Sequence, residues 1–508
     1  MVYLNWIIFN KQLSGLTGKC FKITTVPYRN KLCVIKSKNK MLKKISVRIL
    51  LAISILILTF ISCKKSKEED SQKRPNILFI VTDDQRWDAL GYAGNTIIKT
   101  PNMDELASSG LYFSNAFVTT PICAASRATL FTGLYERTHN YTFGKPDLND
   151  NYMLESYPYL LRQAGYKTGF VGKFGVKVNE GIEDSLFHKI VKTYYPYFKE
   201  VDGKQMHLAD INGNHAIDFI KSNKEKPFCL SLSFWSPHAD DGADEQYFWP
   251  GYCDSLYAKN EIPLPETADP TFFDGLPEFL KTTMNRKRWY WRYDTPEKRE
   301  KMVKGYYKMI SAVDSVIGRI QTTLKEEGLA ENTVIILMGD NGYFLGERGY
   351  AGKWLMHEQS IRVPMIIYDP RQPESERGKT LKEMVLNVDI TPTILKLAGI
   401  DIPESYQGES LTVFYGDTPK KWRSSIFLEH RLEGNPLLLK TECYRDNTWK
   451  FIRYDDNPGF IELYNHKEDL YETKNLAYNS KYADMVKHYK YVCDSTISKL
   501  MSDRISIK

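Results

Sequence analysis

Two patterns of apolar residues alternate along most of the chain after residue 74. Short, nearly continuous apolar runs are separated by segments in which apolar residues recur at helical spacing. Continuous runs indicate strands buried on both faces, and their alternation with helices is typical of a parallel sheet covered by helices. We predict strands at 76–82, 168–172, 228–234, 333–338 and 363–368.

Helical spacing predicts helices at 157–164, 216–221, 301–326 and 390–397. The longest of them, 301–326, is followed by Gly328, a residue that commonly ends helices. Between them, residues 236–300 are rich in Pro, Asp, Trp and Tyr. We predict that this stretch forms long surface loops, which on an α/β scaffold commonly shape a substrate pocket.

The pattern changes after about residue 420. Short strands are predicted at 425–429, 442–445 and 449–454, and an amphipathic helix at 482–501. This order predicts an antiparallel sheet with a terminal helix, packed on the larger domain.

A chain of 508 residues is too long for one small core. We divide it into a leader (1–62), a tether (63–74), a catalytic domain (75–420) and a C-terminal subdomain (421–508).

The leader has the features of a signal peptide. Lys43, Lys44 and Arg48 precede an apolar run of 13 residues, 49–61. That run is short for a bilayer span, which needs about 20 residues, and suits the apolar region of a signal peptide. It ends just before Cys63 in a sequence that resembles a bacterial lipobox. We predict an exported lipoprotein, periplasmic or on the outer membrane or cell surface, held by lipid on Cys63; an uncleaved membrane anchor is the alternative.

The net charge of +7 comes from the leader. Residues 1–62 contain 11 Lys or Arg and no Asp or Glu, so the remainder carries −4. A mildly acidic body gives no support to nucleic-acid binding, and we predict none.

Met41 is an alternative first residue of the chain. Four cysteines of the body could pair in three ways or stay free: Cys229, Cys253, Cys443 and Cys493.

Two of the predicted buried strands end in oxygen-bearing side chains. Asp83 and Asp84 follow 76–82, whereas Asp340 and Asn341 follow 333–338. Ligands of open parallel sheets bind beyond the carboxyl ends of the strands. Three carboxylates and an amide there suit Ca²⁺, with Mg²⁺ as the alternative. Either cluster alone could simply form a turn.

Between these strands, residues 121–133 contain a cysteine at a predicted helix start. A helix that begins near Ala124 places Cys123 at its N-terminus, where backbone N–H groups favour an anion. Arg127 lies one turn later and can reach back over the same position.

This segment, Cys-x-Ala-x-Arg followed by Ala-Thr-Leu-Phe-Thr-Gly, resembles the signature of type I sulfatases, in which the cysteine is oxidised to formylglycine (3-oxoalanine) by a maturation enzyme. The resemblance implies an α/β, alkaline-phosphatase-like fold, with a large mixed, mostly parallel sheet flanked by helices and a smaller C-terminal antiparallel subdomain. Further stretches resemble the family in the same order: 82–85, 165–173, 236–238, 339–342, 352–354 and 462–476.

The resemblance also implies site roles. Five residues would hold the metal: Asp83, Asp84, Asp340, Asn341 and the modified Cys123. Lys173 and Lys353 would bind sulfate oxygens, Arg127 would stabilise the nucleophile, and His238 would protonate the leaving oxygen.

One departure concerns the step that releases sulfate. The family commonly has a histidine where this chain has Gly175. In this chain a nearby base such as His188, or a carboxylate that binds the metal, would have to perform that step. The other polar candidates for contact with the substrate are His139, His430 and Arg431, and a helix-capping or core position is the alternative for His139.

We therefore predict a sulfatase acting on a sulfated carbohydrate, such as a glycosaminoglycan or the algal polymers ulvan and carrageenan. The alternatives are a phosphonate or phosphodiester hydrolase of the same superfamily, and a catalytically silent carbohydrate-binding lipoprotein.

Overall fold

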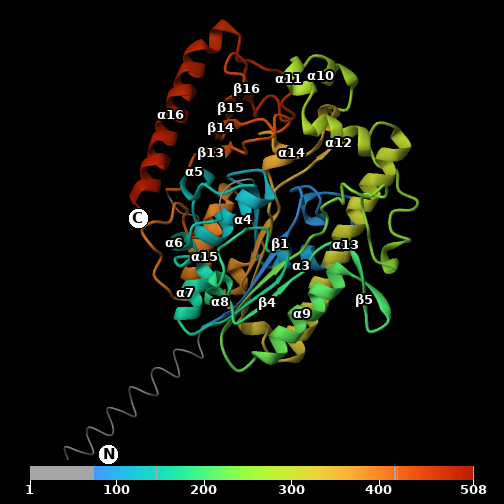
Figure 1. Ribbon diagram of the computed structural model, residues 1–508, viewed down its shortest axis with the longest axis vertical. Helices are drawn as coiled ribbons and strands as arrows, with labels where there is room; N and C mark the ends of the chain where they lie inside the picture. The colour runs from blue at the N-terminus through green and yellow to red at the C-terminus, as the bar shows by residue number, and fades with distance from the viewer. Residues whose placement is uncertain (1–73, 144–146, 417–418, 420, 507–508) are drawn as a thin grey trace, which may run out of the picture. The chain divides into compact units, whose positions relative to one another are not determined.

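An eight-stranded sheet runs through the protein in the order β12-β2-β11-β8-β1-β7-β3-β4 (Figure 1). Only β11 among these strands runs antiparallel to its neighbours, so the predicted mixed, mostly parallel sheet is confirmed. The strands are β1 (Asn76–Thr82), β2 (Leu111–Phe117), β3 (Lys167–Gly172), β4 (Lys189–Lys192), β7 (Phe228–Ser233), β8 (Thr333–Gly339), β11 (Met365–Tyr368) and β12 (Lys379–Leu386).

This computed structural model describes residues 74–506 except 144–146, 417–418 and 420, and they belong to one compact unit, Ser71–Lys508. The predicted leader and the lipobox at Cys63 lie outside the described residues. Within the described part, no helix is long and apolar enough to cross a bilayer.

The central strands end level with one another. Every residue of β1 and β8 is buried, as their continuous apolar sequences require. In the ladders, Thr82 pairs with Gly339 and Gly172 pairs with Ser233. The residues that follow four adjacent strands, β8, β1, β7 and β3, therefore meet at one edge of the sheet.

Helices cover both faces of this sheet (Figure 1). One core cluster joins the sheet to α3 (Pro101–Ser109), α9 (Leu208–Ser222) and α13 (Pro296–Glu326). The other joins it to α4 (Cys123–Thr132), α7 (Tyr157–Gln163) and α15 (Ile390–Leu397). Both faces of the central strands β1, β7 and β8 are buried, and this explains why these strands lack the alternating polar positions of a half-exposed sheet.

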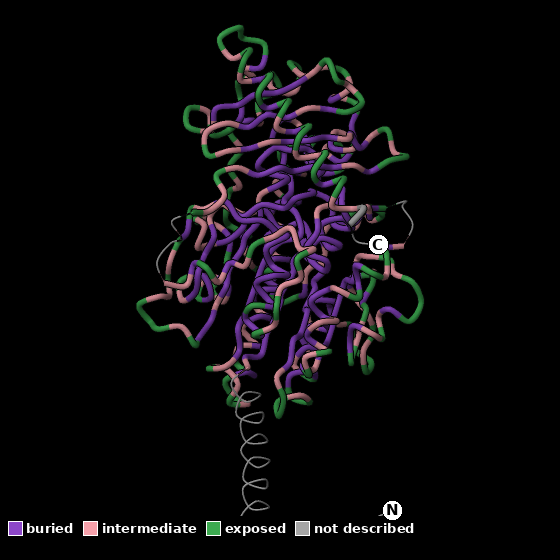
Figure 2. Tube along the Cα trace, turned by 90° about the vertical axis from the view of Figure 1, so that its left-hand side faces the viewer, coloured by how far each residue is buried: buried purple, intermediate pink, exposed green. Residues whose placement is uncertain are grey.

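A second, antiparallel sheet follows, as predicted. It consists of β13 (Ser425–His430), β14 (Thr441–Asp446), β15 (Trp449–Tyr454) and β16 (Ile461–Asn465). The terminal helix α16 (Ala483–Ser506) packs on one face of it. Its strands are largely buried in Figure 2, where exposed residues concentrate in the connecting loops. The division of the chain at residue 420 stays a prediction.

The predicted loop stretch 236–300 is partly helical, which corrects the sequence interpretation. It contains α10 (Pro270–Asp274), α11 (Glu278–Lys281) and α12 (Met284–Arg292). Basic and aromatic residues fill α12, so no clean apolar stripe marks it. The remaining short elements are α5 (Glu136–His139), α6 (Asp150–Met153), α8 (Ile182–Leu186), α14 (Glu358–Ile361), β5 (Phe198–Val201), β6 (Lys204–His207), β9 (Phe344–Leu345) and β10 (Ala351–Gly352).

Candidate active site

Six of the functional side chains predicted from sequence follow the four strand ends that meet at one edge of the sheet: Asp83, Asp84, Lys173, His238, Asp340 and Asn341. The carboxylates of Asp83 and Asp84 come after β1, and Asp340 comes directly after β8. Lys173 comes directly after β3, and His238 lies five residues beyond β7. The sheet thus brings together residues that are distant in the chain, such as Asp84 and Asn341, which are 257 positions apart and whose side chains bond to each other.

Cys123 is the first residue of α4, as predicted. Ile122 precedes it in extended conformation, and its side chain does not cap the helix. The backbone N–H groups at the start of the helix therefore stay free of a side-chain cap. Gly133 ends the helix with a φ of 69°, and its N–H bonds to Thr129 O at 2.8 Å. The small side chains along α4 allow it to lie entirely in the interior.

Cys123 lines a cavity of about 630 Å³ together with Lys173, Lys353 and His238. Aromatic rings form much of the rest of the wall. Lys173 Nζ lies over the Trp235 ring, 4.5 Å from its centroid. Four of the predicted catalytic residues therefore share one cavity, whereas Arg127 lies behind it.

The two lysines contact the paired aspartates. Lys173 Nζ donates to Asp83 Oδ2, and Lys353 Nζ donates to Asp84 Oδ1 at 2.5 Å. All four side chains are at least nine-tenths buried. Burial alone would raise the pKa of Asp83, but the positive charges of Lys173 and its neighbours lower it well below the usual range. Burial alone would lower the pKa of Lys353, but Asp84 raises it above its ordinary value.

Three oxygen atoms in this cluster suit a bound cation. Asp83 Oδ1, Asp84 Oδ2 and Asn341 Oδ1 are buried and have no hydrogen-bond partner among the described residues. Buried unpaired oxygens are costly, and a hard cation is the ligand that such oxygens bind. Asp83, Asp84 and His238 also come within metal-binding distance of one another. The donor set therefore fits Ca²⁺ or Mg²⁺.

Asp340 is engaged differently from the other two carboxylates. Its Oδ1 accepts from the backbone N–H of Asp84 at 3.2 Å, and its Oδ2 accepts from Arg127 Nε at 2.8 Å. Burial, together with the negative charge of Asp83, raises the pKa of Asp340 to about 6. Arg127 also donates to Lys173 O at 2.8 Å and to Ser233. Arg127 thus connects the ends of β3, β7 and β8.

His238 is held by a tyrosine that sequence reasoning missed. The hydroxyl of Tyr195 lies 2.8 Å from His238 Nδ1, and His238 Nε2 faces Asp84 Oδ2 at 3.8 Å. Burial lowers the pKa of His238 to about 4. Tyr195 lies in a loop between strands, where no spacing or motif marks it.

Gly175 has little room for a side chain. Gly175 has a φ of 74°, and a Cβ added there would lie 2.3 Å from Arg127 Cδ. The Arg127 side chain fills the space that a larger residue would need. His188, the alternative base considered above, lies at the far end of β3, where its Nδ1 is 3.1 Å from Thr168 Oγ1. His188 is therefore too far from Gly175 along the strand to replace the histidine that the family commonly has there.

Two further predicted contacts are corrected. His139 is buried: its Nε2 pairs with Thr129 Oγ1 at 3.2 Å and its Nδ1 accepts from a backbone N–H. His430 is fully buried, with Nδ1 2.8 Å from Leu439 O. Neither histidine lines the catalytic cavity, because each is held in the interior by neighbouring backbone. Arg431 lines an adjacent cavity and pairs with Asp455 at 2.9 Å.

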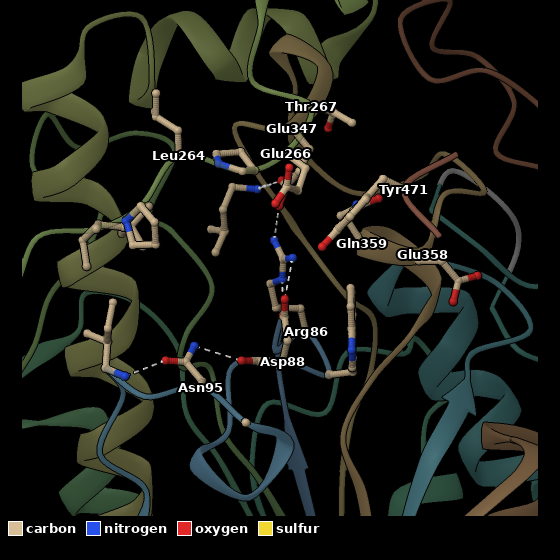
Figure 3. A pocket seen from close by; sticks show the side chains of 18 of the residues that line it. Arg86, Asp88, Asn95, Leu264, Glu266, Thr267, Glu347, Glu358, Gln359 and Tyr471 are labelled. Carbon is tan, nitrogen blue, oxygen red and sulfur yellow. Dashed lines mark hydrogen bonds and ion pairs between the residues drawn. The ribbon is translucent and has the colours of Figure 1, made fainter. Parts of the chain in front are cut away.

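A second large cavity, of about 530 Å³, opens beside Arg86 (Figure 3). Its charged side chains mostly satisfy one another: Arg86 pairs with Asp88 and with Glu347 at 2.6 Å. It contains none of the predicted catalytic residues. The cavity at Cys123 is therefore the candidate active site.

The comparisons with known proteins identify the family of the chain. A family model described as sulfatase matches residues 75–400. The chain belongs to the sulfatase family. A second model, described as the C-terminal part of N-sulphoglucosamine sulphohydrolase, matches residues 346–498. The protein is thus a sulfuric ester hydrolase by family, and the resemblance seen in the sequence is confirmed.

One curated relative, an N-acetylglucosamine-6-O-sulfatase of Bacteroides thetaiotaomicron, is 28% identical over 88% of this chain and 90% of its own length. A solved structure described as a complex with its substrate D-glucosamine-2-N,6-O-disulfate has a TM-score of 0.74 at 24% identity, covering 85% of this chain and 99% of that one. A phosphonate monoester hydrolase from Silicibacter pomeroyi has a TM-score of 0.71 at 20% identity, covering 84% and 96%. These structural likenesses establish the sulfatase fold.

Proposed function

We propose that this sulfatase removes sulfate from a sulfated saccharide, with a formylglycine made from Cys123 as its nucleophile. The observation that carries the proposal is the single cavity that Cys123 shares with Lys173, Lys353 and His238. The curated relative acts, by its name, on a 6-O-sulfated hexosamine, which supports a saccharide substrate. Glycosaminoglycans and sulfated algal polysaccharides are the candidate polymers.

Cys123 needs maturation before it can act. Conversion of its CH₂–SH to an aldehyde is a two-electron oxidation in which sulfur leaves as hydrogen sulfide and oxygen takes its place. A separate maturation enzyme and an external electron acceptor must supply this step. When hydrated, the aldehyde would supply an oxygen nucleophile at the N-terminus of α4.

Asp83, Asp84 and Asn341, with Asp340 beside them, would hold a divalent cation, for which Ca²⁺ is the first candidate. When bound, that cation would supply a fixed double positive charge that polarises the nucleophile and the sulfate group. The hydrogen bond from Arg127 Nε would hold the Asp340 carboxylate in position beside the cation.

The remaining steps belong to side chains of the chain itself. Lys173 and Lys353 would bind the sulfate oxygens, and because both side chains are at least nine-tenths buried, their charges act at short range with little screening. His238 would place its Nε2 proton at the leaving oxygen of the sugar, with Tyr195 bonded to the other ring nitrogen.

The test of the proposal starts from intact-mass measurement after co-expression with a maturation enzyme. We expect Cys123 to carry the aldehyde and the protein to hydrolyse 4-nitrophenyl sulfate. Cys123→Ala should lower kcat/KM by a factor of at least about 10³ while circular dichroism stays unchanged. An unmodified Cys123 together with retained glycan binding would instead support the silent lipoprotein.

The phosphonate hydrolase alternative is favoured by one observation, the similar fold of the enzyme from Silicibacter pomeroyi. Rates on 4-nitrophenyl sulfate, a phenyl phosphonate monoester and a phosphate diester distinguish the two. We expect the sulfate ester to be preferred; a higher kcat/KM on the phosphonate would reverse the assignment. A panel of sulfated oligosaccharides then identifies the sugar and the sulfate position.

The lipid anchor is also a proposal, because Cys63 lies outside the described residues. We expect the full chain to fractionate with the outer membrane and to incorporate labelled fatty acid. Cys63→Ala should abolish the label and release the enzyme. Membrane retention of that variant would support the uncleaved anchor.

A further inference from the structure

Part of the wall of the catalytic cavity is formed by Tyr141, a residue that the proposed reaction does not use. Its side chain is 6% exposed, and it lines the cavity together with Cys123 and Gly175. Tyr141 follows α5, which packs on α4, the helix that begins at Cys123. The fold thus brings a phenol group to the cavity that holds the nucleophile.

Hydrogen bonds hold Tyr141 between two segments that carry catalytic residues. Its backbone N–H donates to His139 Nδ1 at 3.0 Å, and the other ring nitrogen of His139 pairs with Thr129 Oγ1 of α4 at 3.2 Å. Its hydroxyl oxygen accepts from the backbone N–H of Lys177 at 2.6 Å. Lys177 follows Lys173 by four residues and also lines the cavity. Both ends of Tyr141 are therefore fixed.

The proton of this hydroxyl is free to bind a further group. The Tyr141 oxygen is the acceptor in its bond to Lys177, and no acceptor for its proton occurs among the described residues. A phenol can donate and accept at the same time, so one hydrogen bond of Tyr141 stays open. Burial raises the pKa of Tyr141 above its ordinary value, and the charges of Asp147 and Cys123 act in the same direction. The phenol is therefore neutral at pH 7 and keeps its proton.

Gly175 leaves the catalytic cavity without the side chain that the family commonly has there. Tyr141 reaches the same segment, because Lys177, the donor to its hydroxyl, follows Gly175 by two residues. Cys123 is near enough for its charge to contribute to the raised pKa of Tyr141. The Tyr141 hydroxyl is therefore placed to meet an oxygen atom on residue 123, which Gly175 cannot contact with a side chain of its own.

We propose that the Tyr141 hydroxyl donates a hydrogen bond to an oxygen of the hydrated aldehyde at position 123. The inference rests on the proposed function and adds a residue to the same site. The bond stabilises the hydrate relative to the free aldehyde, and it turns the second hydrate oxygen towards the sulfate that Lys173 and Lys353 bind. The O–H bond of Tyr141 stays intact throughout, so no proton is transferred to or from the phenol.

The experiment compares the matured parent protein with Tyr141→Phe. The first measured quantity is the rate at which methoxyamine converts the aldehyde to an oxime, followed by intact mass without substrate. We expect this rate to rise about threefold to tenfold in Tyr141→Phe, because the hydrate loses a hydrogen bond and more of the aldehyde is free. The kcat on 4-nitrophenyl sulfate should fall about tenfold to hundredfold, whereas the inhibition constant of inorganic sulfate should change less than about twofold.

Tyr152→Phe is the matched control, because Tyr152 is also buried, donates to Thr138 O at 3.0 Å and does not line the cavity. Its oxime rate and kcat should stay within about twofold of the parent values. An unchanged oxime rate in Tyr141→Phe would overturn the proposal, and so would an equal rise in the control. A weakening of sulfate inhibition as large as the loss of kcat would also overturn it, because Tyr141 would then only support the segment of Lys173. Failure of the proposed function shows separately, as a parent protein in which Cys123 stays unmodified and forms no oxime.

Discussion

At the scale of single residues, Tyr195 sets the orientation of the His238 ring. The hydroxyl of Tyr195 lies 2.8 Å from Nδ1 of His238, and this contact keeps Nε2 facing the acidic cluster. The ring packing of Tyr195 against Trp235, with centroids 4.4 Å apart, holds the hydroxyl in position. Tyr195 is thus a positioning residue.

Tyr195→Phe should therefore affect substrates unequally. A sugar alkoxide needs a proton as it leaves, whereas 4-nitrophenolate does not. We expect kcat on a sulfated sugar to fall about tenfold, and kcat on 4-nitrophenyl sulfate to change less than about twofold. Tyr157→Phe, which removes another buried hydrogen bond, to Ser231, should not produce this split. Equal losses on both substrates in Tyr195→Phe would mean that its role is structural only.

Gly175 offers a second test at this scale. Any side chain there needs an unfavourable positive φ and meets Arg127 Cδ. Gly175→Ala should lower the free energy of unfolding by about 2 kcal/mol. Urea unfolding measures it, with Gly181→Ala as the control: its φ is also positive, at 83°, but no atom lies within 4 Å of its Cβ position. Equal losses in both variants would show that Arg127 does not fill the space.

At the scale of elements, α13 supplies the missing hydrogen-bond partner for the start of α3. Asp314 of α13 accepts from the backbone N–H of Met103 at 2.8 Å and from the Asn102 amide at 2.7 Å. The carboxylate thereby satisfies donors that a helix start leaves free. Its position is buried, and burial raises the pKa of Asp314 to about 6.

This raised pKa predicts a pH dependence of stability. In the unfolded chain Asp314 ionises near pH 4, and in the folded protein it ionises near pH 6. Between these values the unfolded state loses its proton first, so the folded state loses stability as the pH rises from 4 to 6. Relative to Asp314→Asn, which cannot titrate, the parent should lose up to about 3 kcal/mol of unfolding free energy between pH 4 and pH 7. A difference that stays constant over this range contradicts the assignment.

At the scale of the whole molecule, a buried ion cluster joins the two sheets. Glu358 of α14 accepts from Arg445 Nε of β14 at 3.0 Å and from Lys450 Nζ of β15 at 2.7 Å. Lys450 also bonds to Glu472. Glu358, Glu472 and His466 lie within metal-binding distance of one another. The ammonium of Lys450, however, occupies the position between the two carboxylates that a metal ion would need. We therefore assign these three residues a structural role.

Removing one charge from this cluster should weaken the attachment of the C-terminal sheet. Glu358→Gln leaves Arg445 without its buried counter-ion, and we expect it to lower the free energy of unfolding by about 3 kcal/mol in urea at pH 7. Glu327→Gln, which breaks an exposed pair with Lys224, is the control and should cause no resolvable change. A native-like stability in Glu358→Gln would mean that apolar packing alone holds the second sheet.

The sequence by itself determined the buried strands β1 and β8, the acidic residues at their ends and the helix start at Cys123. Each of these is a local signal, since continuous apolar runs and the residues next to them depend on neighbours in the chain. Only the tertiary structure decided that Tyr195 holds His238, that Arg127 fills the space at Gly175, and that His139 and His430 lie in the interior. The contacts of Tyr195 with His238 and of Arg127 with Gly175 join segments that are distant in the chain, so no local pattern encodes them. The burial of the two histidines depends on how the elements around them pack.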